Sequence, residues 1–244
     1  MPLVSIITPV LPRADDHLRA AYRSLADQAL PAGWEWEWLV HIDGGGIPDW
    51  LDELTDPRVH VAADAHHHGA ALARNLLVSR SAGSHLKVLD ADDQLTPGAL
   101  ARDLEVVCDH PDVAWVTSRA RDLLDDGTLV EFDGAPAPGL VPTGALFRAW
   151  VDQDFRSSIH PATLLAERRA VLALGGWTAV PTSEDTALLL ALNCCELGWF
   201  RDEVGLIYRK WSSQLTSQDH HRSAELSHLR HAFIQQRCEL LLRG

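Results

Sequence analysis

The first half of the chain alternates short, largely apolar runs with longer segments whose apolar residues recur every three or four positions. The short runs predict buried strands at residues 4–7, 59–61, 86–89 and 113–117. The longer segments predict helices at residues 18–29, 69–82 and 100–107. This alternation over residues 1–118 predicts a largely parallel α/β sheet.

A different pattern covers residues 34–38. Trp34, Trp36 and Trp38 alternate with Glu35 and Glu37. A period of two predicts a strand with the tryptophans on one face and the glutamates on the other. We expect the tryptophan face to pack against a covering helix rather than to form a ligand platform.

The second half is less regular. A Pro/Gly-rich loop covers residues 134–142, and the pattern predicts strands at residues 128–132, 161–166 and 204–211. A helix is predicted over residues 185–197. From about residue 217, helical spacing of Leu226, Leu229, Phe233 and Leu240 predicts a long amphipathic helix.

Composition and charge exclude several classes of protein. A formal net charge of -13 argues against a nucleic-acid partner, which normally requires a basic face. No apolar run approaches the roughly 18 residues of a transmembrane segment, and the N-terminus lacks the features of a signal peptide. Four cysteines without C-x-x-C spacing fit a reducing compartment. We therefore expect a cytoplasmic protein.

Acidic residues follow two of the predicted strands. Asp43 comes after the strand that contains the tryptophans, and Asp90, Asp92 and Asp93 follow the run at residues 86–89. Ligands of open α/β sheets bind outside the carboxyl ends of the strands. Crowded carboxylates require a positive charge among them, and Mg²⁺ typically binds one or two carboxylates together with substrate phosphates. The pattern predicts a divalent metal that holds a diphosphate, with a solvated, capped turn as the alternative.

Several motifs carry a family resemblance. VSIITPV, a strand ending in IDGGG, and HHHGAALARNLLVSRSAGSHLKVLDADDQLTPGAL are followed by IHPATLLAERRAVLALGGW and SEDTALLLAL. In this order, over residues 3–215, they resemble the inverting family 2 glycosyltransferases of the GT-A fold. The resemblance implies a Rossmann-like mixed α/β sheet flanked by helices and a C-terminal helical tail. It also implies transfer of a sugar from a nucleoside-diphosphate sugar to an acceptor hydroxyl.

The resemblance suggests a domain organisation. Residues 1–215 are expected to form one catalytic domain, with a nucleotide-binding half at 1–118 and an acceptor-binding half at 119–215. Residues 216–244 are expected to form the C-terminal helix.

The resemblance also assigns residues to roles. It implies that Asp185 is the general base and that Glu184 supports it, although Asp185 could instead cap the helix that follows. Asp93 is the preferred metal ligand, with Asp92 beside it, and the ion is Mn²⁺ or Mg²⁺. The residues implied to bind the nucleotide sugar are Thr8, Pro9, Asp43, Arg74, Asp90, Asp92 and His160.

Asp43 bears on the base of the nucleotide. A carboxylate accepts hydrogen bonds from the N–H groups of uracil, thymine or guanine and finds less to hold on cytosine. We therefore expect UDP, dTDP or GDP rather than CDP, with UDP or dTDP preferred. The acceptor stays open between a polysaccharide, a lipid-linked molecule and a small natural product.

One departure from the family affects the C-terminal side of the site. The family often has Tyr-Arg-x-His where this chain has YRKW at residues 208–211. Arg209 or Lys210 could replace the missing histidine, or His220 or His221 could fold back. The run of three histidines at residues 66–68 is interpreted as a polar loop rather than a zinc site.

Two other functions remain as alternatives. The DADD sequence is also similar to the haloacid dehalogenase phosphatases, although Gln94 stands where that family needs Thr or Val. The chain could also be a nucleotide-sugar-binding protein with impaired catalysis, since the Tyr-Arg-x-His histidine is missing.

Overall fold

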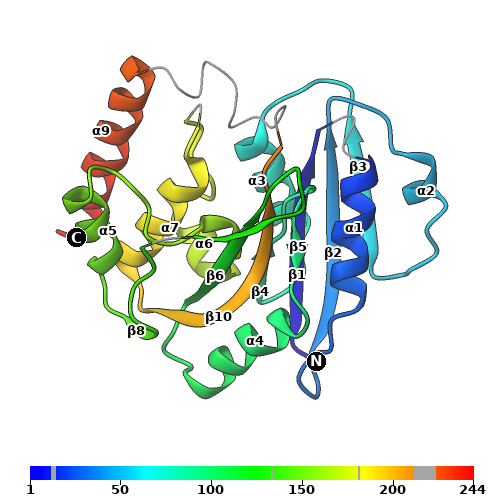
Figure 1. Ribbon diagram of the computed structural model, residues 1–244, viewed down its shortest axis with the longest axis horizontal. Helices are drawn as coiled ribbons and strands as arrows, with labels where there is room; N and C mark the ends of the chain where they lie inside the picture. The colour runs from blue at the N-terminus through cyan, green and yellow to red at the C-terminus, as the bar shows by residue number, and fades with distance from the viewer. Residues whose placement is uncertain (12–14, 133, 181, 212–223) are drawn as a thin grey trace.

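The computed structural model describes residues 1–11, 15–132, 134–180, 182–211 and 224–244. Within these residues, ten strands form one mixed sheet, and helices cover both of its faces (Figure 1). This arrangement confirms the predicted α/β class. The same part of the chain holds no helix with the length and apolar character needed to span a bilayer.

One side of the sheet is parallel, as the alternation of strands and helices predicts. Its strands, in spatial order, are β3 (Val59–Asp64), β2 (Glu35–Asp43), β1 (Leu3–Val10) and β4 (His85–Val88). In the register, Ile7 lies between Leu39 of β2 and Val88 of β4. The carboxyl ends of β2, β1 and β4 therefore meet at one edge. β1 continues to Val10, beyond the predicted end at Thr8.

The other side of the sheet is mixed. β9 (Leu165–Glu167) runs antiparallel to β4 and to β6 (Trp115–Leu123), and β10 (Gly198–Arg209) runs parallel to β6. Three short strands complete it: β5 (Gln94–Leu95) and β8 (Gly139–Val141) pair with β10, and β7 (Leu129–Glu131) pairs with β6.

The strand predicted at residues 161–166 is partly wrong. Pro161–Thr163 forms a short 3₁₀ helix, η1, and only Leu165–Glu167 is a strand. Pro161 cannot donate a backbone hydrogen bond to a ladder, so the chain turns before it enters the sheet.

Two apolar clusters lie on opposite faces of the sheet. On one face, α1 (Asp15–Ala26), α2 (Asp49–Asp52) and α4 (Ala99–Asp109) pack on side chains such as Ile6 and Val40. On the other face, Ile7 and Leu39 contact a second cluster. The helices of the second face are α3 (Ala70–Arg80), α5 (Ala145–Asp152), α6 (Arg168–Ala173), α7 (Glu184–Cys195) and α9 (Ala224–Leu241).

The two faces of β2 carry tryptophans and glutamates in the predicted alternation. Trp36 and Trp38 are buried in the first cluster, which confirms that they serve packing. Glu37 points to the opposite face but is also buried. Its Oε1 accepts hydrogen bonds from Ser5 Oγ at 2.6 Å and from the Ala82 backbone N–H at 2.7 Å. Glu37 is therefore shielded by the segment that follows α3, whereas Glu35 at the start of β2 is exposed.

Two helices present a different face from the one their apolar spacing suggests. In α3, Leu72 is exposed while Arg74 is buried. In α9, Leu229 and Phe233 are 59% and 45% exposed. The C-terminal helix is present, and its buried members of the second cluster are Ile234 and Cys238, with the partly buried Leu241 packed beside them. A narrow stripe that includes the i, i+4 pair therefore docks this helix, while Leu229 and Phe233 face outward.

Candidate functional site

The acidic turn predicted from the sequence lies at the carboxyl end of β4. The Asp93 N–H donates to the Asp90 carbonyl at 3.1 Å, which closes a four-residue turn. After the turn, β5 pairs with β10, which brings the end of β10 beside the aspartates. The turn thus lies between the parallel and the mixed parts of the sheet.

Arg74 forms ion pairs with three carboxylates at this edge. Its Nη2 lies 2.7 Å from Asp90 Oδ1, and its Nη1 lies 2.9 Å from Glu184 Oε1 and 3.2 Å from Asp185 Oδ1. The Arg74 side chain is only 4% exposed. Burial lowers the pKa of Arg74, but Asp185, Asp90 and Glu184 outweigh it and raise that pKa. Arg74 therefore stays charged and joins the two predicted halves of the site.

Asp185 lies within this cluster rather than at a helix cap. Ser183 occupies the cap position of α7, and no side-chain cap hydrogen bond forms there. Asp185 Oδ1 instead accepts a hydrogen bond from Trp177 Nε1 at 2.6 Å. The pKa of Asp185 is raised to about 7, and burial is the largest cause. Glu184 and Asp90 raise this pKa further, while Arg74 and Trp177 oppose the increase. A carboxylate with such a pKa is suited to general-base chemistry near neutral pH.

Asp92 and Asp93 occupy different environments. Asp92 is half-buried, and its Oδ2 accepts a hydrogen bond from Trp211 Nε1 at 2.8 Å. Asp93 is 0% exposed, and its Oδ1 accepts the Arg209 backbone N–H at 3.0 Å. Within the described residues, Asp93 Oδ2 is buried without a hydrogen-bond partner. Burial, Asp92 and Asp90 together raise the pKa of Asp93 well above its ordinary value.

The YRKW segment, which lacks the histidine of the family motif, contacts both Asp92 and Asp93. The Arg209 backbone holds Asp93, Arg209 Nε donates to the Asp92 carbonyl at 3.2 Å, and Trp211 holds the Asp92 carboxylate. His220 and His221 lie outside the described residues. No group of three or more potential ligands in the described ranges is arranged to hold a metal by itself.

His160 lies near the same edge. Its ring contacts Tyr208, with centroids 4.2 Å apart, and Phe132, with centroids 5.4 Å apart. Burial lowers the pKa of His160 to about 4, Lys210 lowers it further and Asp90 opposes them. His160 is therefore a neutral imidazole at neutral pH.

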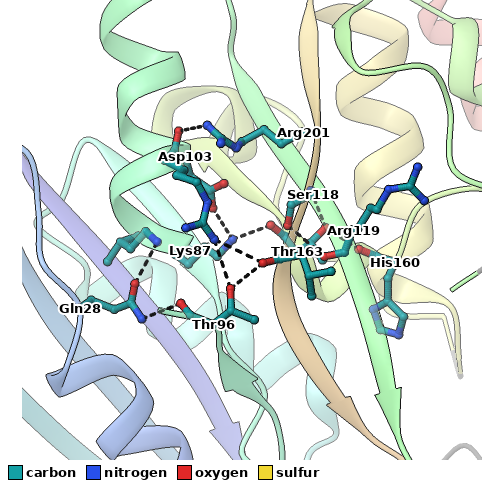
Figure 2. A network of polar contacts seen from close by, with 12 residues as sticks. Gln28, Lys87, Thr96, Asp103, Ser118, Arg119, His160, Thr163 and Arg201 are labelled. Carbon is teal, nitrogen blue, oxygen red and sulfur yellow. Dashed lines mark hydrogen bonds and ion pairs between the residues drawn. The ribbon is translucent and has the colours of Figure 1, made fainter. Parts of the chain in front are cut away.

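A buried polar network fixes the segment that carries His160 (Figure 2). Lys87 Nζ donates to Asp103 Oδ2 at 2.7 Å and to the Thr163 carbonyl at 2.6 Å. Thr163 Oγ1 donates to the His160 carbonyl at 2.8 Å. Lys87 of β4 and Asp103 of α4 thereby hold η1, the short helix that follows His160, in place.

Thr8 and Asp43 do not present free side chains to a ligand. Thr8 is 0% exposed, and its hydroxyl donates to the Leu89 carbonyl at 2.6 Å and accepts from Trp38 Nε1 at 2.8 Å. Asp43 accepts the His68 and Gly69 backbone N–H groups, both at 2.8 Å. His67 Nδ1 also lies 2.8 Å from Asp43 Oδ2. The hydrogen bonds of both residues stabilise the edge of the sheet, whereas Pro9, near the carboxyl end of β1, is half-buried.

Sequence reasoning missed four residues of this region: Lys87, Trp177, Arg209 as a backbone donor, and Trp211. Only two of them left a signal. Lys87 is a charged residue inside a buried strand, and Trp177 follows two glycines shortly before the Glu184-Asp185 pair.

The chain is similar in sequence to a family of known proteins. The sequence model of glycosyl transferase family 2 matches residues 5–130, which include Arg74 and the acidic turn. This match replaces the phosphatase interpretation of DADD.

Curated relatives come from polysaccharide biosynthesis. The chain is 32% identical over 139 residues to TuaG of Bacillus subtilis (strain 168), named as a teichuronic acid biosynthesis glycosyltransferase. It is 24% identical over 206 residues to the succinoglycan biosynthesis protein ExoO of Rhizobium meliloti (strain 1021). These matches cover 55% and 80% of this chain, and 54% and 57% of the two relatives. The chain thus spans little more than half the length of either relative.

Solved structures share the fold. S. aureus TarS 1-349 in complex with UDP-GlcNAc superposes with a TM-score of 0.68 at 16% sequence identity, covering 89% of this chain and 61% of TarS 1-349. At this identity the likeness shows the fold alone.

Proposed function

The chain belongs to glycosyl transferase family 2, and from this membership we propose that it transfers a sugar from a UDP- or dTDP-linked donor to an acceptor hydroxyl with inversion. Mn²⁺ or Mg²⁺ assists the reaction. The observation that carries the proposal is the carboxylate cluster around Arg74, in which Asp185 has a pKa of about 7.

In this proposal Asp185 is the general base. It takes the proton of the acceptor hydroxyl as the oxygen attacks the anomeric carbon from the face opposite the leaving diphosphate. Glu184 holds Arg74 from the neighbouring position at 2.9 Å and so supports the base indirectly. Arg74 orients Asp185 and places a positive charge next to the reacting groups.

The residues present fit a divalent metal. Asp92 and Asp93 offer the oxygen ligands that Mg²⁺ and Mn²⁺ prefer. Asp93 Oδ2 is buried and has no hydrogen-bond partner among the described residues, so a cation bound there would satisfy it. We assign Asp92 and Asp93 as the protein ligands. When bound, the ion supplies Lewis-acid stabilisation of the charge that develops on the departing diphosphate.

The donor assignment draws on the relatives. TarS has been solved with UDP and with UDP-GlcNAc, and these complexes support a uracil-type base. We place the base near Pro9 and the loop of residues 67–69, whose position Asp43 fixes through its two backbone hydrogen bonds. Asp90 and His160 lie on the sugar side. The relatives' names favour a saccharide acceptor.

Calorimetric titration with UDP, dTDP, GDP and CDP, each with Mn²⁺ and with EDTA, tests the donor and the metal. We expect the tightest binding for UDP or dTDP and a loss of affinity in EDTA and in Asp92→Asn. Nuclear magnetic resonance of the transfer product identifies its anomeric configuration. Equal affinity with Mn²⁺ and EDTA contradicts metal dependence, a preference for CDP contradicts the base assignment, and a retained configuration contradicts inversion.

A further inference from the structure

The loop between α6 and α7 carries a buried tryptophan directed at the proposed base. Trp177 is 3% exposed, and its indole N–H donates to Asp185 Oδ1 at 2.6 Å. The same oxygen lies 3.2 Å from Arg74 Nη1. Both contacts hold Oδ1, which leaves Oδ2 as the oxygen that can receive a proton from an acceptor.

Asn75 holds the backbone of this tryptophan from α3. Asn75 Oδ1 accepts the Trp177 backbone N–H at 2.8 Å, and Asn75 Nδ2 donates to the Trp177 carbonyl at 2.9 Å. Gly176 makes this approach possible. It has φ +75°, and a Cβ there would lie 2.2 Å from Asn75 Oδ1, so a side chain would displace the clamp.

The C-terminal helix holds the same loop from the other side. Arg237 of α9 donates from Nη1 to Thr178 Oγ1 at 2.6 Å and from Nη2 to the Leu174 carbonyl at 2.8 Å. Two hydrogen bonds from Arg237 of α9 and a reciprocal pair from Asn75 of α3 thus hold the loop that carries Trp177. A side chain supported in this way loses little additional freedom when it orients a neighbour.

We propose that Trp177 is a positioning residue for the proposed glycosyl transfer: its indole N–H orients the Asp185 carboxylate, and Asn75 and Arg237 hold Trp177 in place. This inference rests on the proposed function, in which Asp185 is the base. In this proposal Trp177 acts through Asp185, which its indole N–H contacts.

The hydrogen bond has a chemical consequence besides orientation. The charged or titratable groups that face Asp185 are Arg74 from α3, Glu184 from α7 and Asp90 from the acidic turn. Because an N–H donor stabilises the ionised carboxylate, its removal disfavours that form. Loss of the indole N–H should therefore shift the titration of Asp185 to higher pH.

Trp177→Phe tests the proposal because it keeps an aromatic ring and removes only the donor. We expect the acidic limb of the kcat/KM profile to move up by about one pH unit, which lowers kcat/KM about tenfold on that limb. The affinity for UDP and Mn²⁺ should not change. A ¹³C-carboxyl titration, with Asp185→Asn identifying the resonance, should show the same shift without any need for turnover.

Trp115→Phe is the matched control. Trp115 is also fully buried, and its Nε1 has no hydrogen-bond partner in the described part of the chain. The control therefore removes the same atoms without removing a hydrogen bond, and both profiles should stay as in the wild type.

The outcomes separate this inference from the proposed function. An unchanged ¹³C titration of Asp185 in a folded Trp177→Phe overturns the role of Trp177, whatever the activity. Absence of sugar transfer and of nucleotide binding in the wild type overturns the proposed function instead. If Trp177→Phe does not fold, Asn75→Ala, which frees the backbone of Trp177, should shift the same resonance in the same direction, and an unshifted resonance overturns the inference.

Discussion

Two buried cations, Lys87 and Arg74, differ in the charge balance of their surroundings. Lys87 is 1% exposed and pairs with one carboxylate, Asp103, whose side chain is 2% exposed. Arg74 is 4% exposed and pairs with three carboxylates: Asp90, Glu184 and Asp185. The first group is electrically matched, while the second carries an excess of negative charge.

The difference separates a structural pair from a chemically active cluster. The matched pair satisfies its charges and also donates a hydrogen bond to the Thr163 carbonyl, so it has little to offer to a ligand. In the unmatched cluster, burial and the neighbouring carboxylates raise the pKa of Asp185 to about 7. Such an excess is favourable only where a proton or a cation joins the site during function.

Removal of the base from the unmatched cluster should have the largest effect. Asp185→Asn keeps the shape of the side chain, so UDP affinity should stay near the wild-type value. Turnover should fall about 10²- to 10⁴-fold, the usual contribution of general-base catalysis. Steady-state kinetics measure this. Near-normal turnover in the variant would assign the base elsewhere, with Glu184 as the next candidate.

Removal of the cation from the matched pair should act on stability. Lys87→Met leaves the Asp103 carboxylate buried without its partner, which costs about 3–5 kcal/mol of unfolding free energy. Urea unfolding measures the loss. The double variant Lys87→Met with Asp103→Leu removes both charges and should recover most of the stability, because a well-packed apolar pair is often neutral. No recovery would mean that the two residues do not act as a pair.

The pH dependence of stability should reveal the unmatched cluster. The pKa of Asp185 in the folded state, about 7, lies above the ordinary value of an aspartate. The folded protein therefore binds this proton more tightly than the unfolded chain. Its contribution to stability is complete below the unfolded pKa and is lost as the pH rises through about 7.

Urea unfolding between pH 4 and 8 measures this dependence, with Asp185→Asn as the reference. The variant should lose less stability than the wild type as the pH rises over that range. Parallel curves for the two proteins would contradict the raised pKa.

An exposed pair should show the smallest effect. Arg121 Nη2 and Glu131 Oε1 lie 2.6 Å apart between β6 and β7, with side chains 43% and 51% exposed. Water and salt screen such pairs, so Glu131→Gln should change the unfolding free energy by less than about 1 kcal/mol. A larger loss, measured by the same urea titration, would show that distance rather than burial controls the strength of these pairs.

The fold was accessible from sequence wherever the pattern was local. Period-two and helical spacing located β2, α4 and the parallel strands, because burial on one face is written into adjacent residues. The faces of α3 and α9 were not accessible in this way. Arg74 is buried because carboxylates from other segments surround it, and α9 docks through Ile234 and Cys238 while Phe233 stays exposed.

The candidate site was also predictable from sequence only in part. The sequence predicted Arg74, the acidic turn and the Glu184-Asp185 pair from motif order, and the structure brings all of them to one edge. It also predicted that Thr8 and Asp43 would meet the nucleotide, yet their polar atoms are engaged by Leu89, Trp38 and the loop of residues 67–69. Hydrogen bonds between distant segments cannot be inferred from the spacing of either segment alone.

For this protein, the sequence by itself determined the family, the alternation of strands and helices, and the carboxylates that follow the strands. These features depend on residue types within a few positions of one another. Only the tertiary structure decided how the carboxylates are paired and protonated. Arg74 and Glu184 are 110 positions apart, and the pKa of Asp185 depends on burial and on charges from three separate segments. Electrostatic energies follow distances in space, which the fold alone establishes.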